Sequence, residues 1–253
     1  MAADFVEING YRTRVVDEGV GAAVVLIHGT PLDLSFWDPL VARLGDRRTV
    51  RYDVRGHGSA RGVPVPEPDV LAADLVALLD RLDLPDAHLL GHSWGGQIAQ
   101  RAVLDHPDRV RRVSLLCTRA SPFPPFADAA AALRAGLADR EASLARWFTA
   151  DELPGPAPLV ETIRAQLHRA DPQAWAAALD SIAVFDVLGE LPRVDVPVDV
   201  VAAQHDAVAV PSHMARIANA LPHGRLYVLD GARHLAPLQH PDVIARILTR
   251  IIS

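Results

Sequence analysis

The chain has 253 residues, half of them apolar, and a formal net charge of −6, so we expect one large folded domain and no extensive disorder. The negative charge and the lack of a basic stripe argue against nucleic acid as a partner, and no apolar run approaches the length of a membrane span. All 25 basic residues are arginine, which excludes lysine Schiff bases and Ser–Lys dyads. The single cysteine, Cys117, cannot form an internal disulfide, and residues 1–5 lack the charged and apolar regions of a signal peptide; both features favour the cytoplasm.

Short β-rich runs alternate with helical patterns along most of the chain. This alternation predicts an α/β fold with a mostly parallel, eight-stranded, twisted sheet and helices on both faces. The predicted strands cover residues 5–9, 13–17, 23–28, 49–54, 87–91, 110–117, 198–203 and 225–229, and the predicted helices cover 69–82, 95–106, 211–221 and 241–251.

The alternation stops between residues 119 and 185, which are rich in alanine and show no strand pattern. A proline-rich run at 154–158 interrupts this helical stretch. We therefore expect a core formed by residues 1–118 and 186–253, with residues 119–185 inserted after the sixth strand as a helical cap. Such a cap lies over the carboxyl ends of the strands, where open α/β sheets bind their ligands.

The sequence Gly91-His92-Ser93-Trp94-Gly95 joins a predicted strand to a predicted helix. A serine between glycines at such a corner is typical of a nucleophile elbow, because the turn is too tight for flanking side chains. The turn exposes the serine Oγ and leaves the next backbone N–H facing the reaction centre. We therefore expect Ser93 to be a nucleophile rather than a residue of a chance loop.

A serine nucleophile needs a base and a group that orients the base. His234 and Asp206 each follow a predicted strand, so both are expected at the sheet edge that holds Ser93. His205 and Asp230 are neighbouring alternatives whose side chains are expected to point elsewhere. His88 and His92 lie four residues apart on a strand and turn and cannot form a helical metal pair, no metal site is predicted, and His92 is expected to be structural.

An oxyanion hole is the second requirement of acyl chemistry. Trp94 would donate one backbone N–H. Thr30 is the other candidate donor, since it follows the predicted strand at 23–28 and Pro31 has no N–H. The glycine-rich loop at 53–58 contains Arg55 and His57, and we expect it to support the oxyanion loop without performing chemistry.

These motifs resemble those of the α/β-hydrolase superfamily over nearly the whole chain, with the closest resemblance to 3-oxoadipate enol-lactonases and cofactor-free haloperoxidase-like esterases. The resemblance implies a capped α/β sheet, a small lactone with a carboxylate as substrate, and no cofactor. The residues at 28–31 are more similar to esterases and haloperoxidases, and Trp94 replaces a methionine that is common in both groups. The pieces that carry the resemblance are residues 51–58, 115–118, 145–149, 185–186, 205–207 and 231–235.

Together these features predict a serine hydrolase that cleaves a small ester or lactone through an acyl-enzyme. Trp147, Phe148 and Trp175 are candidate substrate contacts in the cap, although each is equally suited to packing the cap onto the core. Arg119, Arg134 and Arg146 are candidates for binding a substrate carboxylate. Perhydrolysis, carbon–carbon cleavage, cyclisation and acyl transfer remain open alternatives, as does a ligand receptor that keeps the triad; the sequence leaves the oligomeric state open.

Overall fold

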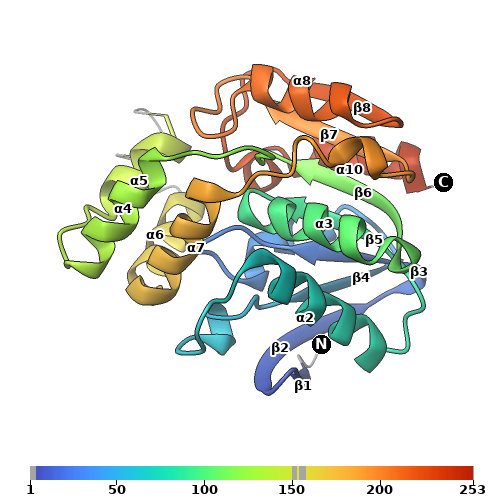
Figure 1. The fold of residues 1–253 in the computed structure, drawn as a ribbon, viewed down its shortest axis with the longest axis horizontal. Coiled ribbons are helices and arrows are strands. Elements are labelled where there is room, and N and C mark those ends of the chain that lie inside the picture. Colours follow the sequence, from blue (N-terminus) through green and yellow to red (C-terminus); the bar gives the residue numbers. More distant parts are fainter. Residues whose placement is uncertain (1–3, 150–152, 154–157, 253) are drawn as a thin grey trace.

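The computed structural model describes residues 4–149, 153 and 158–252. The strands in this part of the chain are β1 (Asp4–Ile8), β2 (Tyr11–Glu18), β3 (Val20–Ile27), β4 (Arg47–Tyr52), β5 (Ala87–His92), β6 (Val110–Leu116), β7 (Val198–Ala203) and β8 (Gly224–Leu229). They form one sheet in the order β1-β2-β4-β3-β5-β6-β7-β8 (Figure 1). β2 pairs antiparallel with β1 and β4, and every other neighbouring pair is parallel. The predicted mostly parallel, eight-stranded sheet is confirmed.

Several strand ends differ from the prediction, among them the starts of β3 and β4. β3 begins at Val20 rather than at residue 23, and residues 20–22 are exposed and precede a register shift against β4. β4 begins at Arg47 rather than at residue 49, and the two arginines at its start are half-buried. An apolar pattern reveals only the buried part of a strand, so these ends carry no sequence signal.

The central strands are buried on both faces. Val24–Ile27 of β3 and all residues of β5 and β7 are buried. Parallel strands covered by helices on both sides have continuous apolar runs rather than alternation, and these strands have that composition. Because these strands are parallel, their carboxyl ends lie together at one edge of the sheet.

Helices cover the two faces of this sheet. In Figure 1, α2, α3 and α8 lie in front of the strands and α10 lies behind them. α2, α7 and α8 each have a proline in the first turn, where the missing N–H costs no hydrogen bond. The α-helices of the described residues are α1 (Asp38–Val41), α2 (Pro68–Arg81), α3 (Trp94–Asp105), α4 (Pro125–Arg134), α5 (Glu141–Trp147), α6 (Pro158–Arg169), α7 (Pro172–Val184), α8 (Pro211–Ala220), α9 (Ala236–Gln239) and α10 (Pro241–Ile252), and the short 3-10 helices are η1 (Leu34–Trp37), η2 (Gly58–Ala60), η3 (Pro107–Arg109) and η4 (Leu191–Arg193).

Helices α4 to α7 follow β6 and precede β7. They gather beside the arrowhead of β6, at the left of Figure 1, and α4 packs against α7. No strand occurs among the residues described in this stretch. Residues 154–157 of the predicted proline-rich interruption lie outside the described residues, and Pro158 begins α6.

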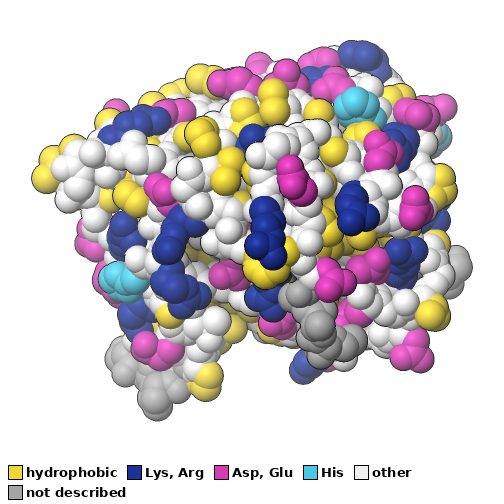
Figure 2. Space-filling model, turned by 90° about the horizontal axis from the view of Figure 1, so that it is seen from below, with side chains coloured by type: hydrophobic (Ala, Val, Ile, Leu, Met, Phe, Trp, Pro, Cys, Tyr) yellow, Lys and Arg dark blue, Asp and Glu magenta, His cyan; other side chains and the backbone are white. Residues whose placement is uncertain are grey.

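The face of the molecule shown in Figure 2 carries basic and acidic side chains interspersed with apolar ones. Ion pairs connect some of the charges of the chain, such as Arg48 with Asp17 at 2.7 Å. Among the residues that the structure describes, no helix combines the length and apolar character needed to cross a bilayer.

Candidate active site

Ser93 lies at the corner between β5, which ends at His92, and α3, which begins at Trp94. Its backbone has φ of +53° and ψ of −118°, in a region that residues with side chains rarely adopt. The Ser93 N–H donates to the Leu116 carbonyl at 2.9 Å, and the Thr118 hydroxyl donates to the Ser93 carbonyl at 2.6 Å. Strain of this kind is concentrated at functional sites, where the surrounding structure holds it.

The glycines around Ser93 allow backbone segments to approach each other closely. A Cβ added to Gly95 would lie 2.1 Å from the Ile27 carbonyl oxygen, and one added to Gly91 would lie 2.5 Å from the Gly95 carbonyl oxygen. A Cβ on Gly96 would lie 2.6 Å from the Cβ of Thr118. The packing of α3 against β3 and against the end of β6 therefore requires the glycine pattern seen in the sequence.

The structure brings Ser93, His234 and Asp206 together from three separate strand ends. The Ser93 Oγ lies 3.1 Å from His234 Nε2, and His234 Nδ1 lies 2.8 Å from Asp206 Oδ2. Asp206 follows β7 and His234 follows β8, which are neighbouring parallel strands. The alternatives His205 and Asp230 are exposed to solvent. The three predicted residues therefore form a continuous hydrogen-bonded chain, with the hydroxyl at one end and the carboxylate at the other.

The carboxylate of Asp206 is buried and stays ionised. Burial alone would raise its pKa, but the charge and hydrogen bond of His234 and two backbone donors outweigh burial and lower the pKa. Asp206 Oδ1 accepts from the N–H groups of Val208 at 2.7 Å and Ala209 at 3.0 Å. This leaves Oδ2 free to accept from His234 Nδ1, so Nε2 of the imidazole faces Ser93 as an acceptor.

His92 supports this arrangement from behind. Its Nε2 donates to the carbonyl oxygen of His234 at 2.8 Å, and its side chain is buried. Burial, followed by the nearby His234, lowers the pKa of His92 to about 3, so it is neutral near pH 7. His92 therefore holds the backbone of His234 in place, and its hydrogen bond is to that backbone rather than to the Ser93 hydroxyl.

Thr30, the first of the two predicted oxyanion residues, follows β3, is buried, and lines the same cavity as Ser93 and His234. The neighbouring Gly29 lies against Ser93, since a Cβ added there would lie 3.0 Å from the Ser93 Cβ. Trp94, the second, starts α3 directly after Ser93, and its indole is fully buried. Both backbones therefore run beside the Ser93 side chain.

A cavity of about 40 Å³ opens at Ser93. Thr30 and His234 belong to its wall, together with Trp147 of α5 and Trp175 of α7, which are two of the three predicted cap contacts. Phe148, the third, is 1% exposed and lies in the apolar core rather than in the cavity wall. The other lining residues are Phe126, Ala129, Ser143, Arg146, Leu179, Ile182 and Val208.

A larger cavity of about 220 Å³ continues outward from the first. The two share Ser143, Arg146, Trp175 and other residues of α4, α5 and α7. The two cavities therefore adjoin each other, and the inner one lies beside Ser93. Arg146 and Trp175 lie where the two cavities meet.

Leu179 and Ile182 of α7 line the cavity but escaped the sequence analysis, which predicted only Trp175 on this helix. Trp175, Leu179 and Ile182 have the four-then-three spacing of one helix face on α7. This spacing was available in the sequence, but it also describes a helix face buried in an ordinary core. Only the position of α7 over the strand ends shows that this face lines a cavity.

The loop at 53–58 carries a network of buried polar contacts. The Arg55 guanidinium donates to both Asp74 carboxylate oxygens, at 2.7 and 2.9 Å. Asp53 accepts from the N–H groups of Leu34 and Ser59, at 2.9 and 2.8 Å. Since Leu34 lies in the segment after β3, Asp53 ties this loop to the segment that contains Thr30.

Comparison with known proteins places this arrangement among related sequences. The sequence profile described as alpha/beta hydrolase family matches residues 24–247. The chain is 28% identical over 237 residues to 3-oxoadipate enol-lactonase 2 of Acinetobacter baylyi, with 91% of this chain and 88% of that protein covered. It is also 28% identical over 261 residues to a putative non-heme chloroperoxidase of Synechocystis, with 94% of this chain and 93% of that protein covered.

A solved structure shows the same similarity in three dimensions. The enol-lactonase from Burkholderia xenovorans LB400 superimposes with a TM-score of 0.93 at 28% sequence identity. The match covers 98% of this chain and 99% of that chain. Sequence and fold therefore agree on the group of proteins to which this chain is similar.

Proposed function

The chain belongs to the alpha/beta hydrolase family, and we propose that it is a serine hydrolase that cleaves a small ester or lactone through an acyl-enzyme. The observation that carries the proposal is the hydrogen-bonded series Ser93–His234–Asp206, with contacts of 3.1 and 2.8 Å. The strained backbone of Ser93 and the ionised Asp206 support it. The similarity to enol-lactonases supports the class of bond.

In the proposed reaction, Ser93 Oγ attacks the substrate carbonyl carbon while its proton passes to His234 Nε2. The backbone N–H groups of Thr30 and Trp94 stabilise the oxyanion of the tetrahedral intermediate. Collapse of the intermediate breaks the ester bond, and the leaving oxygen takes the proton from His234. Water then attacks the acyl-enzyme with His234 as base, which releases the acid and restores the serine. Asp206 stabilises the imidazolium in both halves.

We further propose that residues 119–185 act as a cap over Ser93 and that the substrate carries a carboxylate. Helices α4, α5 and α7 of this stretch supply most of the wall of the two cavities. Arg146 is exposed to solvent and also lines both cavities, so we place its side chain at the rim of the site. It donates to the Ser143 hydroxyl at 3.0 Å, and no ion pair involves it within the described residues.

The other two predicted carboxylate ligands already have partners, although Arg119 also lines a small cavity of about 10 Å³ at Ser93. Arg134 forms an ion pair with Asp180, and Arg119 donates to the Val208 carbonyl at 2.7 Å. Arg146 is therefore the arginine that best supports recognition of an anionic arm in the outer cavity. For a lactone, that contact would also keep the tethered alcohol from turning back onto the acyl group.

The experiment compares a lactone carrying a carboxylate arm with its methyl ester and with p-nitrophenyl acetate. Ser93→Ala should lose at least about 10³-fold in kcat on every substrate. Arg146→Gln should raise KM about tenfold for the carboxylated lactone alone, because a charged hydrogen bond is lost. Arg134→Gln, matched in charge but paired with Asp180, should leave KM unchanged.

Two outcomes would contradict parts of this proposal. Full activity in Ser93→Ala would rule out the serine mechanism. An equal effect of Arg146→Gln on all three substrates would rule out the carboxylate contact and leave the esterase activity standing. A further assay with added hydrogen peroxide tests perhydrolysis, which is suggested by the similarity to a putative chloroperoxidase.

A further inference from the structure

His57 is a buried histidine that the proposed reaction does not use as a base. Its imidazole Nδ1 lies 3.1 Å from the Arg55 carbonyl oxygen, and its Nε2 lies 2.8 Å from the Thr30 Oγ1. Its ring also packs on the indole of Trp94, with ring centroids 5.0 Å apart and planes at 38°. One side chain therefore contacts both residues whose backbone N–H groups are proposed to hold the oxyanion.

The contact between His57 and Thr30 has a single direction. A carbonyl oxygen only accepts, so His57 Nδ1 carries the hydrogen toward Arg55 and Nε2 is left as an acceptor. The Thr30 hydroxyl must then be the donor to Nε2. Burial, followed by the nearby His28, lowers the pKa of His57 to about 3, so the ring keeps this neutral form near pH 7.

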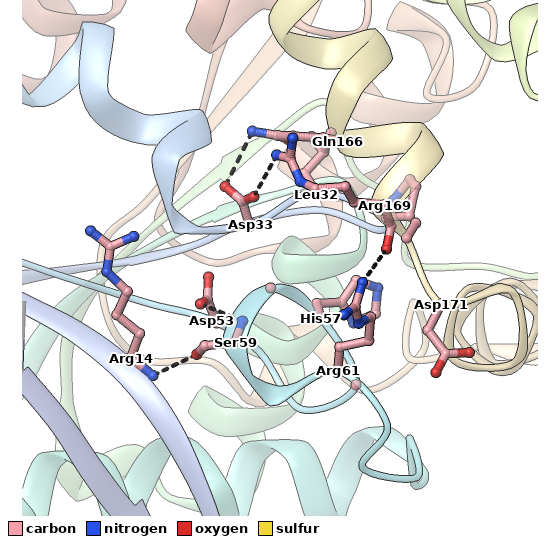
Figure 3. Close-up of a pocket in the computed structure, with 14 residues that line it drawn as sticks. Arg14, Leu32, Asp33, Asp53, His57, Ser59, Arg61, Gln166, Arg169 and Asp171 are labelled. Atoms are coloured by element: carbon pink, nitrogen blue, oxygen red, sulfur yellow. Dashed lines mark hydrogen bonds and ion pairs between the residues drawn. The ribbon is translucent and has the colours of Figure 1, made fainter.

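The loop that carries His57 is rigid on both sides of it. Gly58 has φ of +51°, and a Cβ added there would lie 2.3 Å from the carboxyl carbon of Asp53. Asp53 accepts from the Ser59 N–H next to that glycine. Figure 3 shows Asp53, His57 and Ser59 on this loop, at the wall of a separate cleft of about 290 Å³. His57 is thus held from its own loop and can in turn hold the segment after β3.

We propose that His57 is a positioning residue of the oxyanion hole, whose Nε2 accepts a hydrogen bond from the Thr30 hydroxyl and so fixes the direction of the Thr30 backbone N–H. This inference rests on the proposed function. The Thr30 hydroxyl donates to His57 and so offers only lone pairs to the cavity. Stabilisation of the oxyanion by Thr30 then comes from its backbone N–H, and the side chain serves to aim that group.

A double-mutant cycle tests the hydrogen bond. His57→Phe keeps a ring against Trp94 but removes the acceptor, and Thr30→Val removes the donor while keeping the backbone N–H. Each should lower kcat about tenfold with KM within twofold, since aiming affects the transition state more than the bound substrate. The double variant should be no slower than either single variant, because the same bond is lost. Thr30→Ser and His57→Gln should recover most of kcat.

His88 offers a matched control. It is also a buried imidazole with a hydroxyl partner, at 2.9 Å from Ser114 Oγ, but it lies near the amino end of β5, whereas Ser93 follows the carboxyl end. His88→Phe should leave kcat unchanged when all variants are assayed well below their melting temperatures. Equal losses in His88→Phe and His57→Phe would overturn the proposal, because a general cost of removing a buried histidine would then explain both.

The cleft in Figure 3 allows a second measurement. In His57→Ala, imidazole added to the solution should enter through this cleft and restore kcat toward the wild-type value. Failure of rescue together with unchanged kcat in His57→Phe and Thr30→Val would overturn the role of His57, as would effects of the two substitutions that simply multiply. Ser93→Ala distinguishes a failure of this inference from a failure of the proposed function. If Ser93→Ala is inactive while the substitutions at His57 have no effect on kcat, the positioning role of His57 is wrong and the serine mechanism stands.

Discussion

Asp206 uses its two carboxylate oxygens for different purposes. Oδ1 accepts from the N–H groups of Val208 and Ala209, which fixes the orientation of the carboxylate. Oδ2 accepts from His234 Nδ1 at 2.8 Å. Since the carboxylate cannot rotate without losing backbone hydrogen bonds, the imidazole is held in the tautomer that presents an acceptor to Ser93.

The first prediction is at the scale of this single residue. Asp206→Asn keeps the size of the side chain, but its amide N–H would face His234 Nδ1 and favour the opposite tautomer. We expect kcat on p-nitrophenyl acetate to fall by about 10³- to 10⁴-fold, with a smaller change in KM. His205→Asn, at the exposed neighbouring position, should retain activity. A loss of less than tenfold in Asp206→Asn would mean that the carboxylate does not orient the base.

At the scale of elements, the site depends on how closely α3 packs against the strands. Gly91 and Gly95 flank the nucleophile, and at both the nearest foreign atoms to an added Cβ are backbone atoms, which cannot move aside as a flexible side chain would. The position of Ser93 at the corner between β5 and α3 is therefore fixed by close backbone contacts with the sheet.

The second prediction concerns this corner. Alanine is intrinsically favoured over glycine within a helix by about 1 kcal/mol, so Gly95→Ala would stabilise an unobstructed helix. Its Cβ would instead lie 2.1 Å from the Ile27 carbonyl oxygen, and the clash should dominate. We expect the free energy of unfolding to fall by about 2 kcal/mol or more and kcat to collapse as Ser93 is displaced. Chemical denaturation and steady-state kinetics measure the two effects.

Gly189→Ala is the control for this substitution, because no atom lies within 4 Å of a Cβ added at Gly189. It should leave both stability and kcat close to the wild-type values. A stable, active Gly95→Ala variant would contradict the close packing of α3 against β3.

At the scale of the whole molecule, burial of neutral histidines ties stability to pH. Burial is the largest cause that lowers the pKa of His57, His88 and His92 from 6.5 to about 3. In the unfolded chain these groups take up protons below about pH 6.5, whereas the folded chain does not bind them until about pH 3. The unfolded state thus binds more protons in this window, and stability falls as the pH decreases through it.

The third prediction follows from this difference in proton binding. Between pH 7 and pH 5, each of the three histidines should reduce the free energy of unfolding by about 2 kcal/mol. Asp206, whose folded pKa is lowered from 3.8, loses its contribution only at more acidic pH, so it does not obscure the effect. In His88→Gln, the difference in unfolding free energy between the two pH values should be smaller by about 2 kcal/mol. Urea titrations at both pH values measure this, and an unchanged difference would contradict the assignment.

Local sequence was sufficient to predict the sheet, its central strands and the residues placed at their ends. The buried runs of β3, β5 and β7 are apolar because they are covered on both faces, and glycines flank Ser93 because backbones approach there. Both requirements act on a few consecutive residues, so both can be recognised in the local sequence. For the same reason, the exposed start of β3 and the half-buried, arginine-bearing start of β4 were not predicted, since neither needs to be apolar throughout.

The wall of the cavity is a different matter. Phe148 and Trp147 are adjacent and similar in character, yet Trp147 lines the cavity and Phe148 packs in the core. Likewise, nothing local to His57 indicates that its Nε2 meets Thr30, 27 residues away. Which side of a helix faces a cavity, and which loops meet, depends on how distant elements pack. Because the hydrophobic effect is non-directional, an apolar residue in the sequence does not indicate which distant segment will cover it. The sequence thus determines the strands of the mostly parallel sheet and indicates the acyl chemistry expected at Ser93, while the strand order and the shape around that serine arise from packing between distant segments.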